Sequence, residues 1–139
     1  MKFTNTTQAD TEQLTEWIQA DPYHKDCLNP QWWFTGNGLL SYCLQDSKGP
    51  TMYVRLDKDE ELLRLHTQFA PDNQVSKLRV VKSLMYALPR MEQFAKSKDL
   101  KGYVYRSTSQ SLIDFMQIKF GFTPVGANDD YWLPFERET

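Results

Sequence analysis

The chain has 139 residues, of which 40% are hydrophobic and 14% aromatic, which is enough for one domain with a core and too few for two. Its formal net charge of −2 argues against a protein that binds nucleic acid or an anionic membrane through a basic surface. We therefore predict a single globular domain over residues 1–139.

The N-terminal part of the chain predicts a short strand and a helix. Residues 2–5 have a strand-like composition, and Asp10 can then cap a helix with Gln13 in the capping-box position. The apolar face of this helix consists of Leu14, Trp17 and Ile18. Residues 21–38 are rich in turn formers and aromatics, with Asn29 and Pro30 suited to open a helical turn, so we predict a structured loop there.

Three strand-like runs follow at 39–46, 51–57 and 62–69, and short polar connections predict an antiparallel meander. The third run alternates between two kinds of residue. Its apolar members, predicted to face a core, are Leu63, Leu65, Thr67 and Phe69, and its polar members are Arg64, His66 and Gln68. His66 is therefore predicted to lie on a polar face of the sheet.

The C-terminal half predicts a long helix, a strand, a second helix and a hairpin. The long helix covers about 76–97, and Pro89 should kink or interrupt it because the ring removes one backbone hydrogen bond. A strand follows at 103–106, and a helix then ends at Gly121. The last segment reads as two strands around a Gly-Ala-Asn-Asp-Asp turn.

This order of elements predicts an α+β fold, a mixed antiparallel and parallel sheet of about six to seven strands flanked by helices. If strands 62–69 and 103–106 are parallel neighbours, the long helix between them is a right-handed crossover. Its first turn then lies at the C-terminal end of strand 62–69, where open sheets usually bind ligands.

The segment STSQSLIDFMQIKFGF resembles the N-x-x-A-x-x-F-Y-x-x-x-G-F segment of the GNAT superfamily of N-acetyltransferases. LLRLHTQFAP looks like the fourth strand of that family, and SKLRVVKSL like its pyrophosphate loop and following helix. The resemblance covers nearly the whole chain in element order, while its specific residues are confined to roughly 63–84 and 107–122. It implies a GNAT-like fold that binds acetyl-CoA or another acyl-CoA.

The family's loop pattern, Q/R-x-x-G-x-G/A, can be aligned in two registers, and neither register restores a glycine. One register begins at Ser76, and the other begins at Gln74. The asparagine position of the family falls on Ser109, and its tyrosine, which protonates the leaving thiolate in many members, falls on Met116 or Gln117. Neither of these two side chains can act as that acid.

The resemblance implies a set of cofactor contacts. The backbone around Gln68 and Phe69 would align the thioester arm, and residues 76–82 would hold the pyrophosphate. The implied cofactor-binding residues are Gln68, Phe69, Ser76, Lys77, Leu78, Arg79, Val80, Val81, Lys82 and Ser109. Lys77, Arg79 and Lys82 crowd a helix start that disfavours cations, so either a bound anion or a solvated outer face explains them.

Other residues carry weaker signals for chemistry. His66 is the candidate catalytic base, because imidazole titrates near neutrality and the side chain projects from the polar face of its strand. A structural role is the alternative, since spacing alone names no partner for this histidine. His24 can line a substrate mouth with Asp21, Tyr23 and Asp26, although turn chemistry explains that segment equally well. The remaining candidates are a Cys27–His24 thiol pair and a cation contact at Asp129 and Asp130. The aromatic cluster of Trp32, Trp33 and Phe34 is either an exposed surface that stacks on a ligand or partner, or part of the core or a lid.

The sequence as a whole predicts acyl-CoA-dependent transfer of an acetyl or other acyl group to an amine on a small molecule or peptide. The alternative is a catalytically inactive GNAT-fold module that binds or supports other proteins, as a homodimer or within an assembly. With two cysteines, Cys27 and Cys43, and no zinc-like spacing, we predict neither a metal site nor a disulfide. No secretory signal or spanning apolar run is evident, and we expect a cytoplasmic protein.

Overall fold

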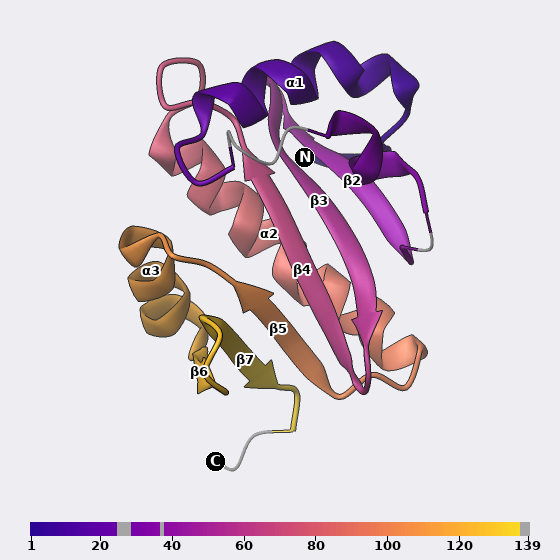
Figure 1. Ribbon diagram of the computed structural model, residues 1–139, viewed down its shortest axis with the longest axis vertical. Helices are drawn as coiled ribbons and strands as arrows, with labels where there is room; N and C mark the ends of the chain where they lie inside the picture. Colours follow the sequence, from indigo (N-terminus) through magenta and orange to yellow (C-terminus); the bar gives the residue numbers. More distant parts are fainter. Residues whose placement is uncertain (25–28, 37, 137–139) are drawn as a thin grey trace.

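The computed structural model describes residues 1–24, 29–36 and 38–136. Its centre is a seven-stranded sheet in the order β1-β2-β3-β4-β5-β7-β6 (Figure 1). The strands are β1 (Lys2–Asn5), β2 (Leu40–Asp46), β3 (Gly49–Asp59), β4 (Leu62–Phe69), β5 (Gly102–Arg106), β6 (Thr123–Val125) and β7 (Asp130–Pro134). The helices are α1 (Thr11–Ala20), α2 (Lys77–Ser97) and α3 (Gln110–Phe120), with short 3-10 turns η1 (Gln8–Asp10) and η2 (Pro30–Phe34).

The antiparallel meander and the parallel crossover are both confirmed. Strands β1 to β4 pair antiparallel in sequence order, and β4 pairs with β5 in parallel after the α2 crossover. β5 pairs antiparallel with β7, and β7 with β6, which makes the sheet mixed as predicted. The predicted number of strands is therefore correct.

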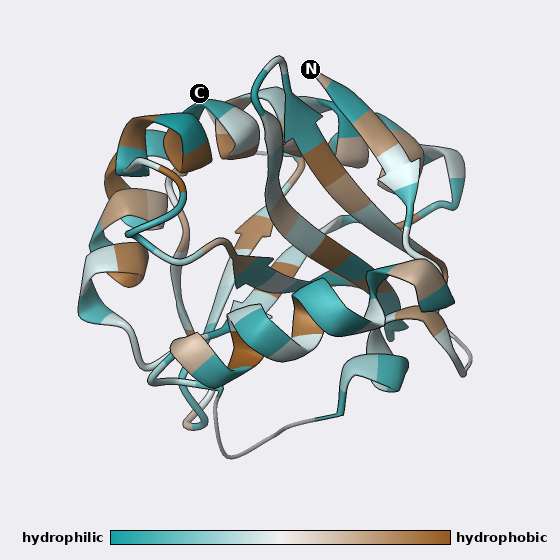
Figure 2. Ribbon diagram, turned by 90° about the horizontal axis from the view of Figure 1, so that it is seen from above, coloured by the Kyte–Doolittle hydropathy of each residue, from teal (hydrophilic) through white to brown (hydrophobic). Residues whose placement is uncertain are grey.

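The helices cover the two faces of the sheet unequally. One face carries α2 and α3, and its core includes Leu56, Leu65, Leu88 and Met116. The other face carries α1 and η2 over only part of the sheet, around the buried side chain of Tyr53 (Figure 1). The long strands show alternating hydrophobic and hydrophilic bands in Figure 2, as expected for a sheet with two different faces.

The predicted capping box of α1 is wrong. The Asp10 side chain makes no cap hydrogen bond to α1; instead it accepts from the Thr7 backbone N–H at 2.8 Å, in a capping box of η1. Its second oxygen accepts from the Tyr53 hydroxyl at 2.8 Å, and Gln13 Nε2 donates to the same hydroxyl at 2.7 Å. Asp10 and Gln13, which the local pattern assigned to the cap, therefore both bind the hydroxyl of Tyr53 instead.

The long helix forms as predicted but is not interrupted at Pro89. Ser76 is its N-cap, and α2 runs without a break from Lys77 to Ser97. Two carbonyls of the turn that precedes the proline accept from side chains: the Arg90 guanidinium donates to the Tyr86 carbonyl at 2.8 Å, and the Tyr103 hydroxyl donates to the Leu88 carbonyl. The hydrogen bond that Pro89 removes is the one to the Met85 carbonyl, and these two donors bind neighbouring carbonyls of the same turn.

Two smaller predictions have mixed outcomes. Helix α3 ends at Gly121, whose φ of 87° is the left-handed conformation that glycine adopts without strain. For the aromatic cluster at 32–34, the exposed alternative is wrong, because Trp33 is buried and both Trp32 and Phe34 are half-buried. Within the described part of the chain, no helix is long and apolar enough to cross a membrane.

Candidate functional site

Strands β4 and β5 lie side by side only at their first residues and then diverge (Figure 1). Their parallel pairing runs from Leu62 opposite Gly102 to Leu65 opposite Tyr105. β4 then continues to Phe69 without a β5 partner. We call His66–Phe69 the open edge of β4. The sequence alone did not predict where the pairing of these two strands ends.

Backbone groups of the open edge point toward the side that β5 has left. The Ala70 N–H donates to the Thr51 carbonyl at 3.0 Å, so Ala70 faces β3. Because successive residues of a strand direct their N–H and C=O groups to alternate sides, Thr67 and Phe69 face away from β3. An extended ligand with amide groups could therefore pair with β4 as an added strand would.

The first turn of α2 follows the open edge and carries uncommitted donors. The Ser76 side chain accepts from the Arg79 N–H at 3.3 Å, and the Ser76 carbonyl accepts from the Val80 N–H at 3.2 Å. Among the described residues, the N–H groups of Lys77 and Leu78 have no acceptor. Free amides at a helix start favour an anion.

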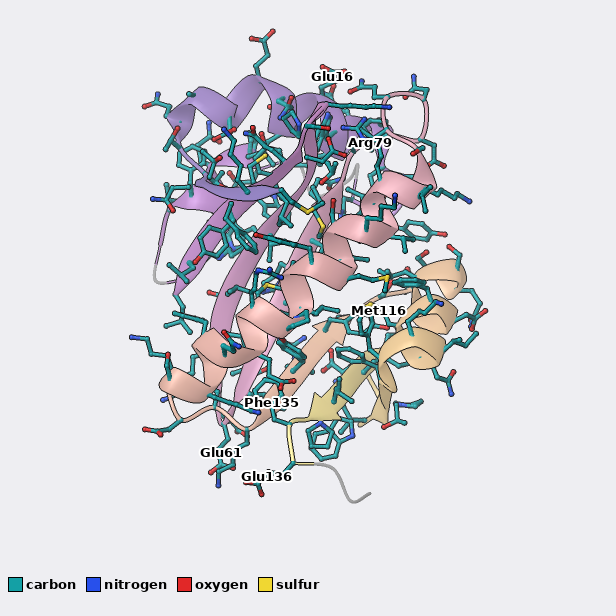
Figure 3. The ribbon with its side chains drawn as sticks, turned by 180° about the vertical axis from the view of Figure 1, so that it is seen from behind. Glu16, Glu61, Arg79, Met116, Phe135 and Glu136 are labelled. Carbon is teal, nitrogen blue, oxygen red and sulfur yellow. The ribbon has the colours of Figure 1, made fainter. Side chains whose placement is uncertain are left out.

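Arg79 is already engaged by an acidic partner. Its Nε and Nη2 donate to the two carboxylate oxygens of Asp46 at 2.7 Å each, which lowers the pKa of Asp46 to about 2. The guanidinium thus reaches across to the turn between β2 and β3; Figure 3 shows Arg79 near the start of α2. The cationic charge of Arg79 is therefore largely neutralised by Asp46.

A surface pocket of about 380 Å³ lies beside this ion pair. It brings together four of the predicted cofactor residues with the β2–β3 turn and the N-terminus. Its lining residues are Met1, Asp46, Ser47, Lys48, Ser76, Leu78, Arg79 and Lys82. Lys77 and Val81 do not line it, and Val80 packs against the α1 side of the core instead. Within the predicted 76–82 segment, some side chains therefore line the pocket and others pack against the core or lie elsewhere on the surface.

His66 lies on the sheet face that carries α1 and η2, in contact with η2. Its Nε2 is 3.1 Å from Asp57 Oδ2, and its ring meets the Trp32 ring edge to face at 4.8 Å. Burial lowers the pKa of His66, although the nearby Asp57 carboxylate opposes that shift. The ring is therefore largely neutral at pH 7, with Asp57 as its hydrogen-bond partner.

Arg55 connects His66's surroundings to η2, and sequence reasoning missed it. Its guanidinium is nearly buried, donates to the carbonyls of Trp32 and Thr35, and pairs with Asp57 at 3.1 Å. It also stacks over the Trp32 ring at 4.2 Å. A buried arginine needs such a set of acceptors, and no local sequence pattern predicts that an arginine will be buried.

Gln68 lies on the polar face of β4 as predicted, but its side chain is completely buried. The alternation of β4 is as predicted, but the C-terminal end of α1 covers this part of the face. Its Nε2 donates to the Asp21 carboxylate and to the Phe69 carbonyl at 3.1 Å each, and its Oε1 lies 2.7 Å from His24 Nδ1. His24 and Asp21, predicted to share a substrate mouth, are thus brought together at the open edge of β4.

The family's tyrosine position is not replaced within α3. Met116 is buried against α2, as Figure 3 shows, and Gln117 is exposed. The described residues offer the buried hydroxyl of Tyr105 no hydrogen-bond partner. Burial raises the pKa of Tyr105, which stands on β5 at the last pair before the strands diverge. Ser109 accepts no cap bond, and its N–H donates to Ser107 Oγ at 3.0 Å.

The remaining candidates have structural surroundings. Asp130 pairs with both Arg64 and Arg106 at 3.0 and 3.1 Å, which lowers the pKa of Asp130. Cys43 is a buried free thiol, and burial raises its pKa to about 11, so it is a poor nucleophile at pH 7. The predictions for Asp26 and Cys27 lie outside the described residues.

No protein-family model matches the sequence, and no curated protein matches it either. Solved structures do share the fold. The ribosomal-protein-S18-alanine N-acetyltransferase from Escherichia coli superposes with a TM-score of 0.69 at 11% identity, over 99% of this chain and 96% of that one. An acetyltransferase of the GNAT family from Staphylococcus aureus gives 0.69 at 14% identity, over 97% and 99%.

A GNAT family acetyltransferase from Brucella melitensis, crystallised with acetyl-CoA, gives a TM-score of 0.59 at 12% identity, over 99% of this chain and 90% of that one. At identities this low, the similarity shows a shared fold and nothing more. The chain therefore has the fold of the GNAT N-acetyltransferases, with a mixed sheet that opens between β4 and β5.

Proposed function

We propose that this protein transfers an acyl group from an acyl-CoA to an amine, with acetyl as the first group to test. The observation that carries the proposal is the open edge of β4, which is followed, after residues 70–76, by a helix start with free amides. An extended, amide-bearing arm fits the first feature, and a pyrophosphate fits the second. Both are parts of one molecule, acyl-CoA.

The residues present fit that cofactor in a specific way. The backbone groups of Thr67 and the N–H of Phe69 would pair with the amides of the arm, while the Phe69 carbonyl already accepts from Gln68. The N–H groups of Lys77 and Leu78 would bind phosphate oxygens. When bound, the cofactor supplies an activated thioester carbonyl. Lys77 would add positive charge, while Arg79 contributes less because Asp46 already holds it. Val80 and Val81 are bulkier than glycine and make close approach of a ligand to their backbone harder.

Similar structures support the reaction class. The Brucella melitensis structure contains acetyl-CoA, and the Escherichia coli enzyme acetylates an alanine of a ribosomal protein. An amine acceptor is therefore the natural proposal for this chain. The sequence favours His66 as the base, but in the structure Asp57 already lies 3.1 Å from its Nε2.

The first prediction concerns cofactor binding. Isothermal titration calorimetry with acetyl-CoA should give a 1:1 complex, because the backbone sites exist without side-chain rearrangement. At a ligand concentration one hundred times Kd, the complex should be more stable to unfolding by about 2.7 kcal/mol. No heat and no thermal shift at millimolar acetyl-CoA would reject the proposed function.

Charge-removing variants locate the site on the protein. Lys77→Ala should weaken acetyl-CoA binding about tenfold, equivalent to about 1.4 kcal/mol, because one phosphate contact is lost. Arg79→Ala should weaken it less, since Asp46 already neutralises that guanidinium. Lys58→Ala is the matched control, an exposed lysine near the opposite end of the sheet. Equal affinities for all three variants would reject the phosphate role of the α2 start.

A second function, a binding module without catalysis, is favoured by one observation. The family's tyrosine position falls on Met116, which is part of the buried core, or on Gln117, which is exposed, and neither side chain can act as the acid. The two functions differ in turnover: a module can bind acetyl-CoA, yet it should not release CoA faster when a peptide with an N-terminal alanine is added. A thiol-release assay with and without that peptide distinguishes them.

A further inference from the structure

The chain has two histidines, and both lie on the sheet face that carries α1 and η2. Acyl transfer to an amine releases a proton from the attacking nitrogen, and imidazole is the side chain best suited to accept it near neutrality. The surroundings of the two rings decide which one is available.

The buried amide of Gln68 has a fixed orientation. Its Nε2 donates to three acceptors: the Trp17 carbonyl at 3.4 Å, Asp21 Oδ2 at 3.1 Å and the Phe69 carbonyl at 3.1 Å. With the amide turned over, an oxygen would face these three oxygens, which is unfavourable. Gln68 Oε1 must therefore be the atom that faces His24.

This orientation determines the tautomer of His24. Its Nδ1 is 2.7 Å from Gln68 Oε1 and 3.3 Å from Asp21 Oδ2, and both of these oxygens can only accept. Nδ1 therefore carries the proton, and the lone pair of the neutral ring is on Nε2. No described residue bonds Nε2, and 42% of the side chain is exposed. Gln68 Nε2 also donates to the carbonyl of Phe69, a residue of the open edge of β4, so one side chain connects the His24 ring to that edge.

The ring of His66 is held differently. Its Nε2 is taken by Asp57, its face is covered by the edge of Trp32, and desolvation lowers its pKa. Arg55 and Arg64 lie close enough to oppose a positive charge on the ring. His66 is therefore better suited to tie η2 to the sheet than to collect a proton.

We propose that His24 is the catalytic base, with Gln68 and Asp21 as positioning residues; this inference rests on the proposed acyltransferase function. The amine nitrogen attacks the thioester carbonyl carbon, the C–N bond forms, and the nitrogen gives its proton to His24 Nε2. The C–S bond then breaks, CoA leaves as the thiolate, and that thiolate takes a proton from solvent. The products are an amide and CoA.

The tautomer can be tested without any substrate. In the single-histidine variant His66→Gln, long-range ¹H–¹⁵N NMR should show His24 protonated at Nδ1 and unprotonated at Nε2. Gln68→Met in the same background should weaken this preference, because the nearer of the two acceptors of Nδ1 is gone and only Asp21 remains. A His24 ring protonated at Nε2 would overturn the proposal even if acetyl-CoA binds.

Kinetics test the role itself. With acetyl-CoA and a panel of amines that includes an N-terminal alanine peptide and a small primary diamine, His24→Gln should lower kcat by about 10²- to 10⁴-fold. The KM for acetyl-CoA should not change, and Gln68→Met should lower kcat without changing KM. Added imidazole should restore part of the kcat of His24→Ala. Melting curves confirm that each variant is folded.

The outcomes separate the two proposals. Loss of kcat in His66→Gln with full activity in His24→Gln would overturn the role of His24 and leave the acyltransferase function standing. Failure of the parent chain to bind acetyl-CoA, or to acylate any amine of the panel, would overturn both.

Discussion

The hydroxyl of Tyr105 is a buried polar group that no described residue satisfies. Its ring is well packed, because it stacks on Tyr131 at 5.5 Å and meets Phe122 edge to face at 5.1 Å. A buried donor without a partner destabilises a fold by about 1–3 kcal/mol. The position at the end of the β4–β5 pairing is therefore maintained at the expense of stability.

Removing that hydroxyl should stabilise the protein. Tyr105→Phe should raise the free energy of unfolding by about 1 kcal/mol, because the ring contacts remain and the unsatisfied donor disappears. The melting temperature should rise by roughly 4 °C for a chain of this size. Tyr131→Phe is the control, because Tyr131 is the half-buried ring that stacks on Tyr105, and it should leave the melting temperature nearly unchanged. Destabilisation of Tyr105→Phe in denaturant melts would show that the hydroxyl has a partner.

Single residues also show where sequence reasoning stops. Asp10 and Gln13 fit a capping box, yet both bind the hydroxyl of Tyr53, which lies far away in sequence. Gln68 has the polar periodicity of an exposed residue, and it is buried because α1 covers it. In both cases a partner distant in sequence decided the outcome, and a local pattern carries no information about such a partner.

At the scale of elements the sequence was more informative. Periodicity predicted the meander, the long helix and the Gly121 stop, because each depends on neighbouring residues alone. The splay of β4 from β5 could not be predicted, since it depends on where pairing ends between segments joined by a helix. The 76–82 segment was correctly placed at the start of α2, but the ion pair of Arg79 with Asp46 was not foreseen.

That ion pair joins α2 to the end of β2 and should make stability depend on acidity. The pKa of Asp46 falls from 3.8 to about 2 on folding, so its contribution is complete above 3.8 and is lost as pH falls toward about 2. Asp46→Asn should therefore be less stable than the parent at pH 6, with the difference shrinking between pH 4 and 2. Exposed Asp72→Asn is the control for removing one carboxylate. A difference in melting temperature that is the same at pH 6 and pH 2.5 would exclude this ion pair as its source.

The whole molecule consists of two parts of a sheet that meet at a short parallel seam. Strands β1 to β4 form one part, β5 to β7 the other, and only Leu62–Leu65 pair with Gly102–Tyr105 between them. Asp130 on β7 reinforces this seam, because it binds Arg64 from β4 and Arg106 from β5. The opening that the proposed cofactor requires thus begins where the two parts are clamped.

Breaking this clamp should loosen the C-terminal part selectively. Asp130→Asn should lower the free energy of unfolding by about 1–3 kcal/mol, because Arg64 keeps its low exposure and loses a charged partner. Hydrogen exchange by mass spectrometry should accelerate in β5, α3 and β7 and stay unchanged in β1 to β3. Asp129→Asn is the matched control. The Asp129 side chain is exposed, and its backbone has a left-handed φ of 58° that asparagine also adopts. Equal acceleration throughout the sheet would mean that the two parts open together, and that the splay between β4 and β5 cannot widen independently to admit a ligand.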